Sequence, residues 1–264
     1  MSDILEELSA LRRADAAERE KSLTLAALER SIAGMDKAQD FFAAFKADCA
    51  RPHIIAELKK ASPSEGLIRE DFDYRRIAIA FEKAGAAAIS VLCECHRFLG
   101  SEEYLRQVRA LVRLPLLYKD FITTRYQIAA ARVAGADVVL LIAAVLDDKA
   151  LSELLNTACG YGLQALVETH TATEIKRAVQ SGARIIGVNC RDLRTFKTDP
   201  AITAELIDDI PESIVRIAES GIKTGADIEF LKARGADGFL IGTTLMRAPD
   251  PAAKLTELST YLPR

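Results

Sequence analysis

The sequence predicts an α/β fold: a closed (β/α)8 barrel of the TIM type with a helical extension at its N-terminus. From residue 54 onward, eight short runs rich in Val, Ile and Leu alternate with longer amphipathic segments, a pattern typical of βα units and parallel strands. In addition, the dipeptide Gly-Ala recurs every 47 to 53 residues, about the length of two such units. We expect one structural domain, in which residues 1–50 form the extension and residues 51–264 form the barrel.

Residues 1–50 show helical periodicity. Apolar residues recur mostly at spacings of three and four, which places them on one face of a helix. A charged stretch, residues 12–21, separates the first apolar group from the second. We interpret all three groups as the packing faces of helices. They are Ile4, Leu8 and Leu11; Leu25, Leu28 and Ile32; and Phe41, Phe42 and Phe45.

The eight runs that follow are mostly apolar throughout and do not alternate between apolar and polar residues. Such runs are expected of parallel strands that are covered on both faces. They lie at residues 54–58, 87–92, 116–118, 138–142, 164–167, 185–188, 214–218 and 238–241.

Each Gly-Ala pair stands just before an even-numbered run. Glycine often ends a helix, because it adopts the positive φ of the turn that leads into the next strand. Four such pairs at near-constant spacing indicate eight units and therefore a closed barrel. An open doubly wound sheet is the alternative, but no Gly-x-Gly-x-x-Gly follows the first run to support it. The pairs begin at Gly85, Gly135, Gly182 and Gly235.

Composition excludes several classes of protein. The chain has 264 residues, of which 50% are hydrophobic, which is enough for a large core, and its net charge is −3. No stripe of Lys and Arg indicates a nucleic-acid partner, and no apolar stretch reaches the ~18 residues of a membrane helix. The N-terminus is acidic and lacks the pattern of a signal peptide. Five cysteines without a framework spacing fit a reducing compartment, so we expect a cytoplasmic protein.

One cysteine group resembles a metal site in part. Cys93 and Cys95 are followed directly by His96. Zinc sites usually have Cys-x2–4-Cys and a second ligand pair elsewhere, and the sequence has no second pair. We therefore predict no metal ligand in this chain.

The first run ends in the most informative residues of the chain. Glu57 and Lys59 are two positions apart, so in a strand they project to the same face. Ser62-Pro63-Ser64 then predicts a turn, and we regard residues 62–66 as a candidate lid. Taken alone, a Glu-x-Lys pair is most often an exposed ion pair of little energetic value.

Polar residues at the ends of the other runs change this interpretation. In a barrel of this kind, active sites lie at the C-terminal ends of the strands. Single residues there have ordinary alternatives, such as helix caps and solvated lysines, but together they place charges of both signs around one opening. Such neighbours perturb pKa values enough for acid–base chemistry. The fourth run ends in apolar residues 143–145, which we expect to form a hydrophobic wall. The polar ends comprise Glu57 and Lys59; Cys93 and Glu94; residues 119–121; Glu168; residues 189–192; residues 219–221; and residues 242–244.

The last two ends favour a phosphate. Ser220 and Gly221 follow the seventh run, and Gly242, Thr243 and Thr244 follow the eighth. Barrels often bind phosphate with these two loops and a short extra helix, because glycine allows close backbone approach and helix N–H groups attract anions. The alternative is that these glycines serve only tight turns.

Several motifs resemble the indole-3-glycerol phosphate synthase family over roughly residues 50–248. The most specific is IAELKKASPSEG at residues 55–66. The others are LYKDFI at 117–122, GVNCRDL at 187–193, AESGI at 218–222 and LIGTTLMR at 240–247. The helical N-terminal region also resembles the extra segment of this family, which lies partly over the active-site opening.

The resemblance implies an activity and five catalytic residues. The family closes the indole ring of 1-(2-carboxyphenylamino)-1-deoxyribulose 5-phosphate with loss of carbon dioxide and water, and it uses no metal or organic cofactor. Lys119 is expected to be the general acid at the substrate ketone. Lys59 is expected to bind a substrate anion and to assist dehydration, and Glu168 to be the base. Glu57 and Asn189 are expected to position these groups.

The resemblance also implies a shell of substrate-binding residues. Phosphate is expected against the loops after the last two strands, and the anthranilate ring against Phe121 and the apolar fourth strand end. The expected partner is therefore a phosphorylated small molecule. The sequence does not determine the oligomeric state and is compatible with a monomer. The substrate-binding residues are Ser62, Phe98, Phe121, Arg191, Ser220, Gly221, Gly242 and Thr243.

Three other functions remain alternatives. A Schiff-base aldolase would use Lys119 or Lys59 as a covalent nucleophile. A phosphoribosyl anthranilate isomerase is disfavoured because no cysteine ends the first run. A non-catalytic phosphate-binding barrel is disfavoured by the intact set of charged residues.

Overall fold

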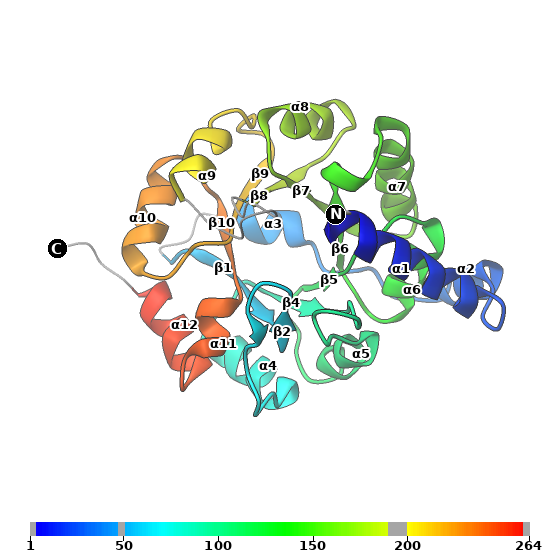
Figure 1. Ribbon diagram of the computed structural model, residues 1–264, viewed down its shortest axis with the longest axis horizontal. Coiled ribbons are helices and arrows are strands. Elements are labelled where there is room, and N and C mark those ends of the chain that lie inside the picture. The colour runs from blue at the N-terminus through cyan, green and yellow to red at the C-terminus, as the bar shows by residue number, and fades with distance from the viewer. Residues whose placement is uncertain (1–3, 47–50, 190–199, 261–264) are drawn as a thin grey trace.

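A closed barrel of eight parallel strands forms the centre of the molecule, which confirms the predicted (β/α)8 class. The computed structural model describes residues 4–46, 51–189 and 200–260. Each strand of the barrel pairs with the next barrel strand along the chain, and β10 pairs with β1 to close the barrel (Figure 1). The strands are β1 (His53–Leu58), β4 (Ala88–Leu92), β5 (Leu116–Lys119), β6 (Val138–Ile142), β7 (Gln164–Thr169), β8 (Ile185–Asn189), β9 (Val215–Glu219) and β10 (Gly238–Ile241).

Helices surround this barrel and cover the outer face of its strands (Figure 1). Leu, Ile, Val and Ala side chains fill the space between the two layers. The helices are α4 (Tyr74–Lys83), α5 (Glu102–Arg109), α6 (Arg125–Val133), α7 (Asp148–Gly160), α8 (Ala172–Gln180), α9 (Pro200–Ile207), α10 (Gly225–Ala233) and α12 (Pro251–Ser259). Shorter elements lie at the strand ends: the hairpin β2 (Ala61–Ser62) and β3 (Gly66–Leu67), the 3-10 turn η1 (Ala143–Val145) and α11 (Thr243–Arg247).

The Gly-Ala pairs end helices as predicted. At the end of α4, Gly85 has φ 87°, and the N–H of Ala86 donates to the carbonyl of Phe81 at 3.1 Å. The N–H of Gly85 donates to the carbonyl of Glu82, which completes a Schellman motif. The same pair of bonds ends α6, α8 and α10. The repeat in the sequence is therefore a repeat of one helix-to-strand turn.

Several strands are longer than the apolar runs that predict them. The structure places Lys119, Asn189 and Glu219 inside their strands, as the last residue of β5, β8 and β9. Asn189 is in register with Glu219, so the backbone pairing continues beneath the polar side chains. These side chains are consequently held by the sheet and not by loops.

Three helices precede the first strand, as the apolar periodicity predicts: α1 (Ile4–Glu20), α2 (Leu25–Ile32) and α3 (Phe41–Lys46). The helix α3 lies within the ring of strands in Figure 1. Its residues Phe41 and Phe45 stack at 4.4 Å and belong to the same buried cluster as Ala88 and Val215, the first residues of β4 and β9. The helix α3 therefore closes the N-terminal end of the barrel.

The other two helices of the extension pack elsewhere. Leu28 of α2 packs against Ala129 and Ala130 of α6. Leu5 and Leu8 of α1 are buried in the cluster that fills the barrel interior and line a cavity at its C-terminal end. The expected boundary near residue 50 falls in residues 47–50, outside the described residues, so the division into extension and barrel stays a prediction. None of the described helices is long and apolar enough to cross a membrane.

Candidate active site

A cavity opens at the C-terminal ends of the strands, where the sequence predicts the site. It contains about 1100 Å³ of empty space, including space open to solvent. Twelve of the thirteen predicted site residues line it, from the first strand to the last loop. The thirteenth, Arg191, lies outside the described residues. The twelve are Glu57, Lys59, Ser62, Phe98, Lys119, Phe121, Glu168, Asn189, Ser220, Gly221, Gly242 and Thr243.

Four charged side chains form the floor of this cavity, and we call them the charged layer: Glu57, Lys119, Glu168 and Glu219. They come from β1, β5, β7 and β9, the first, third, fifth and seventh strands of the barrel. Alternate strands of such barrels contribute the side chains of one interior layer. The residues two positions earlier on the same strands are apolar and belong to the buried cluster of the barrel interior: Ile55, Leu117, Leu166 and Ile217.

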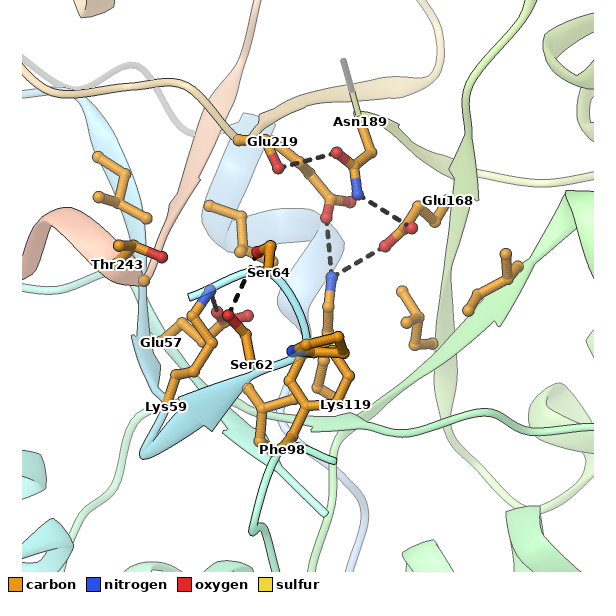
Figure 2. A pocket seen from close by; sticks show the side chains of 18 of the residues that line it. Glu57, Lys59, Ser62, Ser64, Phe98, Lys119, Glu168, Asn189, Glu219 and Thr243 are labelled. Atoms are coloured by element: carbon orange, nitrogen blue, oxygen red, sulfur yellow. Dashed lines mark hydrogen bonds and ion pairs between the residues drawn. The ribbon is translucent and has the colours of Figure 1, made fainter. Parts of the chain in front are cut away.

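Lys119 joins two carboxylates of the charged layer. Its Nζ lies 3.0 Å from Oε2 of Glu168 and 2.8 Å from Oε2 of Glu219 (Figure 2). Burial lowers the pKa of Lys119, but Glu168, Glu219 and Glu57 outweigh it and hold the pKa above its usual range. The ammonium is therefore protonated and serves as a hydrogen-bond donor.

The two carboxylates differ in spite of their common partner. Burial raises the pKa of both, but in Glu168 the cations Lys119 and His170 prevail and the pKa lies well below its usual range. In Glu219, burial together with the charges of Glu168 and Glu57 outweighs Lys119 and raises the pKa to about 7. Glu168 is thus ionised at neutral pH, whereas Glu219 gains or loses its proton near neutral pH.

Asn189 connects the charged layer to the next loop. Its Nδ2 donates to Oε1 of Glu168 at 3.1 Å, and its Oδ1 accepts from Oγ of Ser220 at 2.8 Å. Ser220 has φ 67° and Gly221 has φ 74°, so the chain turns sharply just after β9. The left-handed conformation of Ser220 is unusual for a residue with a side chain and is maintained here at the cavity wall.

Glu57 and Lys59 form a partly enclosed pair and not an exposed one. Nζ of Lys59 lies 2.8 Å from Oε1 of Glu57, and their side chains are only 14% and 4% exposed. Gly242 passes so close that a Cβ at this position would collide with the Glu57 carboxylate. This close approach explains a glycine directly before α11, whose first residue, Thr243, lines the cavity.

The opposite wall of the cavity is apolar. The rings of Phe98 and Phe121 lie 6.3 Å apart, and Leu8 of α1 lies beside them along the cavity. The fourth strand contributes Leu140 and Ile142, which point into the barrel. The expected wall at residues 143–145 is therefore displaced: these residues form η1, and the described lining residues of this strand come from within β6.

A buried carboxylate holds the loop that carries Phe98. The oxygens of Glu94 accept from the backbone N–H groups of Arg97 and Phe98, each at 2.8 Å, and from that of His96. Glu94 is fully buried, so this loop is built around a charge that its own backbone solvates. The aromatic wall is consequently part of a rigid turn.

The helix α1 is tied to the barrel by an ion pair that the sequence does not indicate. Nε and Nη2 of Arg12 donate to the two oxygens of Asp120 at 2.9 and 2.6 Å, and the Asp120 side chain is buried. Asp120 lies between Lys119 and Phe121, so the contact places the extension directly above the site. It also explains why Asp120, which gives no direct signal of its own, follows the lysine.

Arg12 also occupies the one potential metal cluster among the described residues. Asp15, Cys95 and His96 bring possible ligand atoms within 4.8 Å of one another. However, Nη1 of Arg12 donates to Oδ2 of Asp15 at 2.7 Å and to Sγ of Cys95 at 3.7 Å. A guanidinium therefore lies where a metal cation would be bound, and Nε2 of His96 contacts the same Asp15 oxygen at 2.8 Å.

The lid candidate is a small hairpin beside the opening. Ser62, Pro63 and Ser64 line the cavity, and the turn joins β2 to β3. The Glu65 side chain contacts Arg247 at the end of α11. Closure of this hairpin over a ligand stays a prediction.

Comparison with known proteins identifies the family. The family model for indole-3-glycerol phosphate synthase matches residues 5–258. The indole-3-glycerol phosphate synthase of Sulfurimonas denitrificans is 45% identical over 257 residues, which are 97% of this chain and 98% of that protein. That of Carboxydothermus hydrogenoformans is 50% identical over 206 residues, 78% of each chain. The chain belongs to the indole-3-glycerol phosphate synthase family.

Solved structures share the fold at low sequence identity. An N-acetylmannosamine-6-phosphate 2-epimerase from Clostridium perfringens has a TM-score of 0.61 at 15% identity and covers 80% of this synthase-family chain and 93% of its own. A thiamine phosphate pyrophosphorylase from Pyrococcus furiosus has a TM-score of 0.58 at 16% identity, with coverage of 78% and 93%. At these identities the likeness shows the barrel alone.

Two residues in contact with the predicted site residues were given no role in the prediction from the sequence. Glu219 was recognised at a strand end but given no role, although it completes the charged layer. His170 was not considered, and its Nε2 lies 3.4 Å from Oε1 of Glu168. A signal was present: Glu168-x-His170 has the same spacing as Glu57-x-Lys59, an acid and a cation two positions apart at the end of a strand.

Proposed function

We propose that this cavity catalyses the family reaction: ring closure of 1-(2-carboxyphenylamino)-1-deoxyribulose 5-phosphate, with decarboxylation and dehydration, to indole-3-glycerol phosphate. The observation that carries the proposal is the charged layer. It provides a protonated lysine between two carboxylates of different pKa, opposite an aromatic wall and beside a glycine-rich loop. The reaction needs an acid, a base, an apolar surface and a phosphate site in one cavity.

We expect the substrate to bind in this cavity in one orientation. Its phosphate would lie against Gly221, Gly242 and Thr243, where the backbone can approach it closely. Its aromatic ring would lie between Phe98 and Phe121 and the apolar residues of α1. The ketone carbon would then lie above Lys119, because the ribulose chain connects the two ends.

In the first step, Lys119 acts as the acid. The aromatic ring attacks the carbonyl carbon, negative charge develops on the carbonyl oxygen, and the ammonium stabilises and then protonates that oxygen. Carbon dioxide leaves from the ring carbon that formed the new bond, and the bonding electrons remain in the ring. Lys59, paired with Glu57, provides a second cation for the substrate carboxylate or phosphate.

In the second step, Glu168 acts as the base. Water leaves from the former carbonyl carbon when an acid protonates its hydroxyl and Glu168 removes a proton from the neighbouring methylene carbon, which forms the double bond of the five-membered ring. Asn189 orients Glu168 through Nδ2 and is itself oriented by Ser220, so the base has one preferred position. Glu219, with its pKa near 7, is suited to return a proton to Lys119 at neutral pH.

A specific observation disfavours the Schiff-base alternative. An amine must be neutral to attack a carbonyl, and lysines that form Schiff bases have a lowered pKa. The pKa of Lys119 is instead raised by two carboxylates within 3.0 Å. Lys119 is therefore better suited to donate a proton than to form a covalent bond.

The chain itself simplifies the test, because it contains no tryptophan. Purified protein is mixed with the substrate, and indole emission is followed for the wild type, Lys119→Ala and Glu168→Gln. A rising signal that is lost in both variants supports the proposal. Substrate binding without emission would support a non-catalytic barrel, and borohydride trapping of Lys119 would support the aldolase.

We also propose a cytoplasmic location. Its support is that the described cysteines Cys93, Cys95 and Cys159 are free thiols, as expected in a reducing compartment.

A further inference from the structure

Glu168 and Glu219 are chemically equal groups that the site treats differently. Both are buried at the end of odd-numbered strands, and both contact Nζ of Lys119 at nearly the same distance. Their common partner therefore does not decide which of them is the base. A second cationic group lies on the far side of Glu168.

That group is His170. Lys119 contacts Oε2 of Glu168, and Nε2 of His170 lies 3.4 Å from the other oxygen, Oε1. Glu168 is thus placed between two cations, Lys119 and His170.

His170 is held in this position from behind. Its backbone N–H donates to Oε2 of Glu174 at 2.8 Å, and its Nδ1 lies 3.3 Å from the same oxygen. Glu174 is fixed in the first turn of α8, where its own N–H donates to the capping Oγ1 of Thr171. The imidazole therefore bridges two carboxylates, one from β7 and one from α8, and its side chain is 14% exposed.

These contacts keep the imidazole charged. Burial lowers the pKa of His170, but Glu168 and Glu174 outweigh burial and raise it to about 10. At neutral pH both ring nitrogens then carry protons, and the charged ring lies between the carboxylates of Glu168 and Glu174.

We infer that His170 is a positioning residue that keeps Glu168 ionised and oriented while Lys119 turns toward the substrate. The inference rests on the proposed function. When Lys119 donates to the ketone, two neighbouring carboxylates lose their shared cation, and one of them takes up a proton. Because His170 remains beside Glu168, Glu168 stays ionised and can act as the base.

The direct test is a titration of the histidine rings by NMR. The chain has three histidines, His53, His96 and His170, and His170→Gln assigns the relevant signal. We expect the His170 ring to stay protonated above pH 8 and its pKa to fall by about 1 unit or more in Glu168→Gln, with the other two unchanged. A His170 signal that titrates near 6.5, or one that Glu168→Gln does not move, overturns the inference. This test is independent of the reaction.

The kinetic test uses His170→Asn with His96→Asn as a matched control. His96 also pairs with a carboxylate, Asp15 at 2.8 Å, but Asp15 does not line the cavity, whereas Glu168 does. We expect His170→Asn to lower kcat about 10- to 100-fold and to change KM less than about 3-fold. The acid limb of kcat should move to higher pH by about 1 unit, because Lys119 has turned to the substrate in the complex, and the loss of His170 then raises the pKa of Glu168.

Glu174→Gln should shift the same limb in the same direction by a smaller amount, and His96→Asn should leave it in place. A lower kcat with an unmoved acid limb would mean a merely structural role and would overturn the inference, as would an unchanged kcat. A wild-type protein without turnover would instead refute the proposed function, while the NMR result would still stand.

Discussion

The two ends of the barrel are built from the same eight strands and have opposite chemistry. At the N-terminal end, Phe41 and Phe45 of α3 close the barrel with stacked rings against the first residues of the strands. At the C-terminal end, the charged layer lies open beneath a cavity. Burial of apolar surface stabilises the closed end. The open end depends on pairing of charges, and each buried charge there needs a partner in a fixed position.

Stability and function depend on different ends of the barrel. Burial of charge disfavours the folded state unless each charge has a partner, so the open end is a site of low intrinsic stability. The closed end contains none of the charged layer and compensates with aromatic packing. The N-terminal extension takes part in both, since α3 fills the closed end while α1 covers the open one through Arg12 and Asp120.

The largest difference between the ends should appear in a pair of lysine substitutions. Lys119→Ala removes the acid and should lower kcat at least about 1000-fold. Lys46→Ala, at the closed end, removes an ammonium that donates to the carbonyls of Glu212 and Ile214, and should leave kcat within about 2-fold of wild type. Stopped-flow indole emission measures both. Equal losses in the two variants would contradict the separation of the ends.

A pair of phenylalanine substitutions tests the converse. Phe45→Ala should lower the free energy of unfolding by about 3–5 kcal/mol, because its buried ring leaves a cavity, and should leave kcat nearly unchanged where the protein is folded. Phe98→Ala, on the cavity wall, should raise KM about 10-fold, with less than about 2 kcal/mol of destabilisation. Urea unfolding and steady-state kinetics measure these effects, and a stable Phe45→Ala would show that α3 is dispensable.

One identical change at each end sharpens the comparison. A Cβ at Gly187 would collide with the Glu219 carboxylate, and a Cβ at Gly238 would collide with the Phe45 ring. Gly187→Ala should therefore lower kcat about 10- to 100-fold by displacing Glu219. Gly238→Ala should instead cost about 1–3 kcal/mol of stability through overpacking, with kcat unchanged. An exchange of these two outcomes would refute our assignment of the ends.

The smallest effect is a change in how stability depends on pH. The pKa of Glu219 is raised from 4.5 to about 7 by folding, so the folded state binds more protons in this window and wild-type stability falls as pH rises through it. Glu219→Gln removes this fall. Between pH 4.5 and 7, the free energy of unfolding of the variant should therefore rise by about 1–3 kcal/mol relative to that of the wild type. Phe45→Ala changes no charge, so its free energy of unfolding should differ from that of the wild type by the same amount at every pH. Urea unfolding at several pH values distinguishes the two, and parallel curves for Glu219→Gln would contradict the raised pKa.

Much of the fold was predictable because its signals are local. Apolar runs mark strands, and the Gly-Ala pairs mark the Schellman turns that the structure contains. The ends of the strands were less predictable, because the apolar pattern stops at Lys119 or Glu219 while the backbone pairing continues. The wall expected at residues 143–145 was displaced into β6 for a related reason: periodicity does not show which residues of a buried run point inward.

The site was predictable where a pair of residue types at one spacing occurs in few structural settings, as for Glu57 and Lys59. It was less predictable where a partner comes from a distant element. Arg12 reaches Asp120 across the fold, and nothing in either local sequence indicates the pairing. His170 lies between these cases, since its spacing from Glu168 was visible but a single histidine beside a strand has many ordinary uses.

The position of α3 has a consequence for synthesis of the chain. Phe41 and Phe45 leave the ribosome before any strand exists, yet Phe45 packs beside Gly238 of the last strand. With roughly 190 residues between Phe45 and Gly238, translation leaves the two rings without their final partners for about 10 to 40 s. During that interval the aromatic segment around Phe41 and Phe45 is exposed on the nascent chain, so we expect a chaperone to bind there.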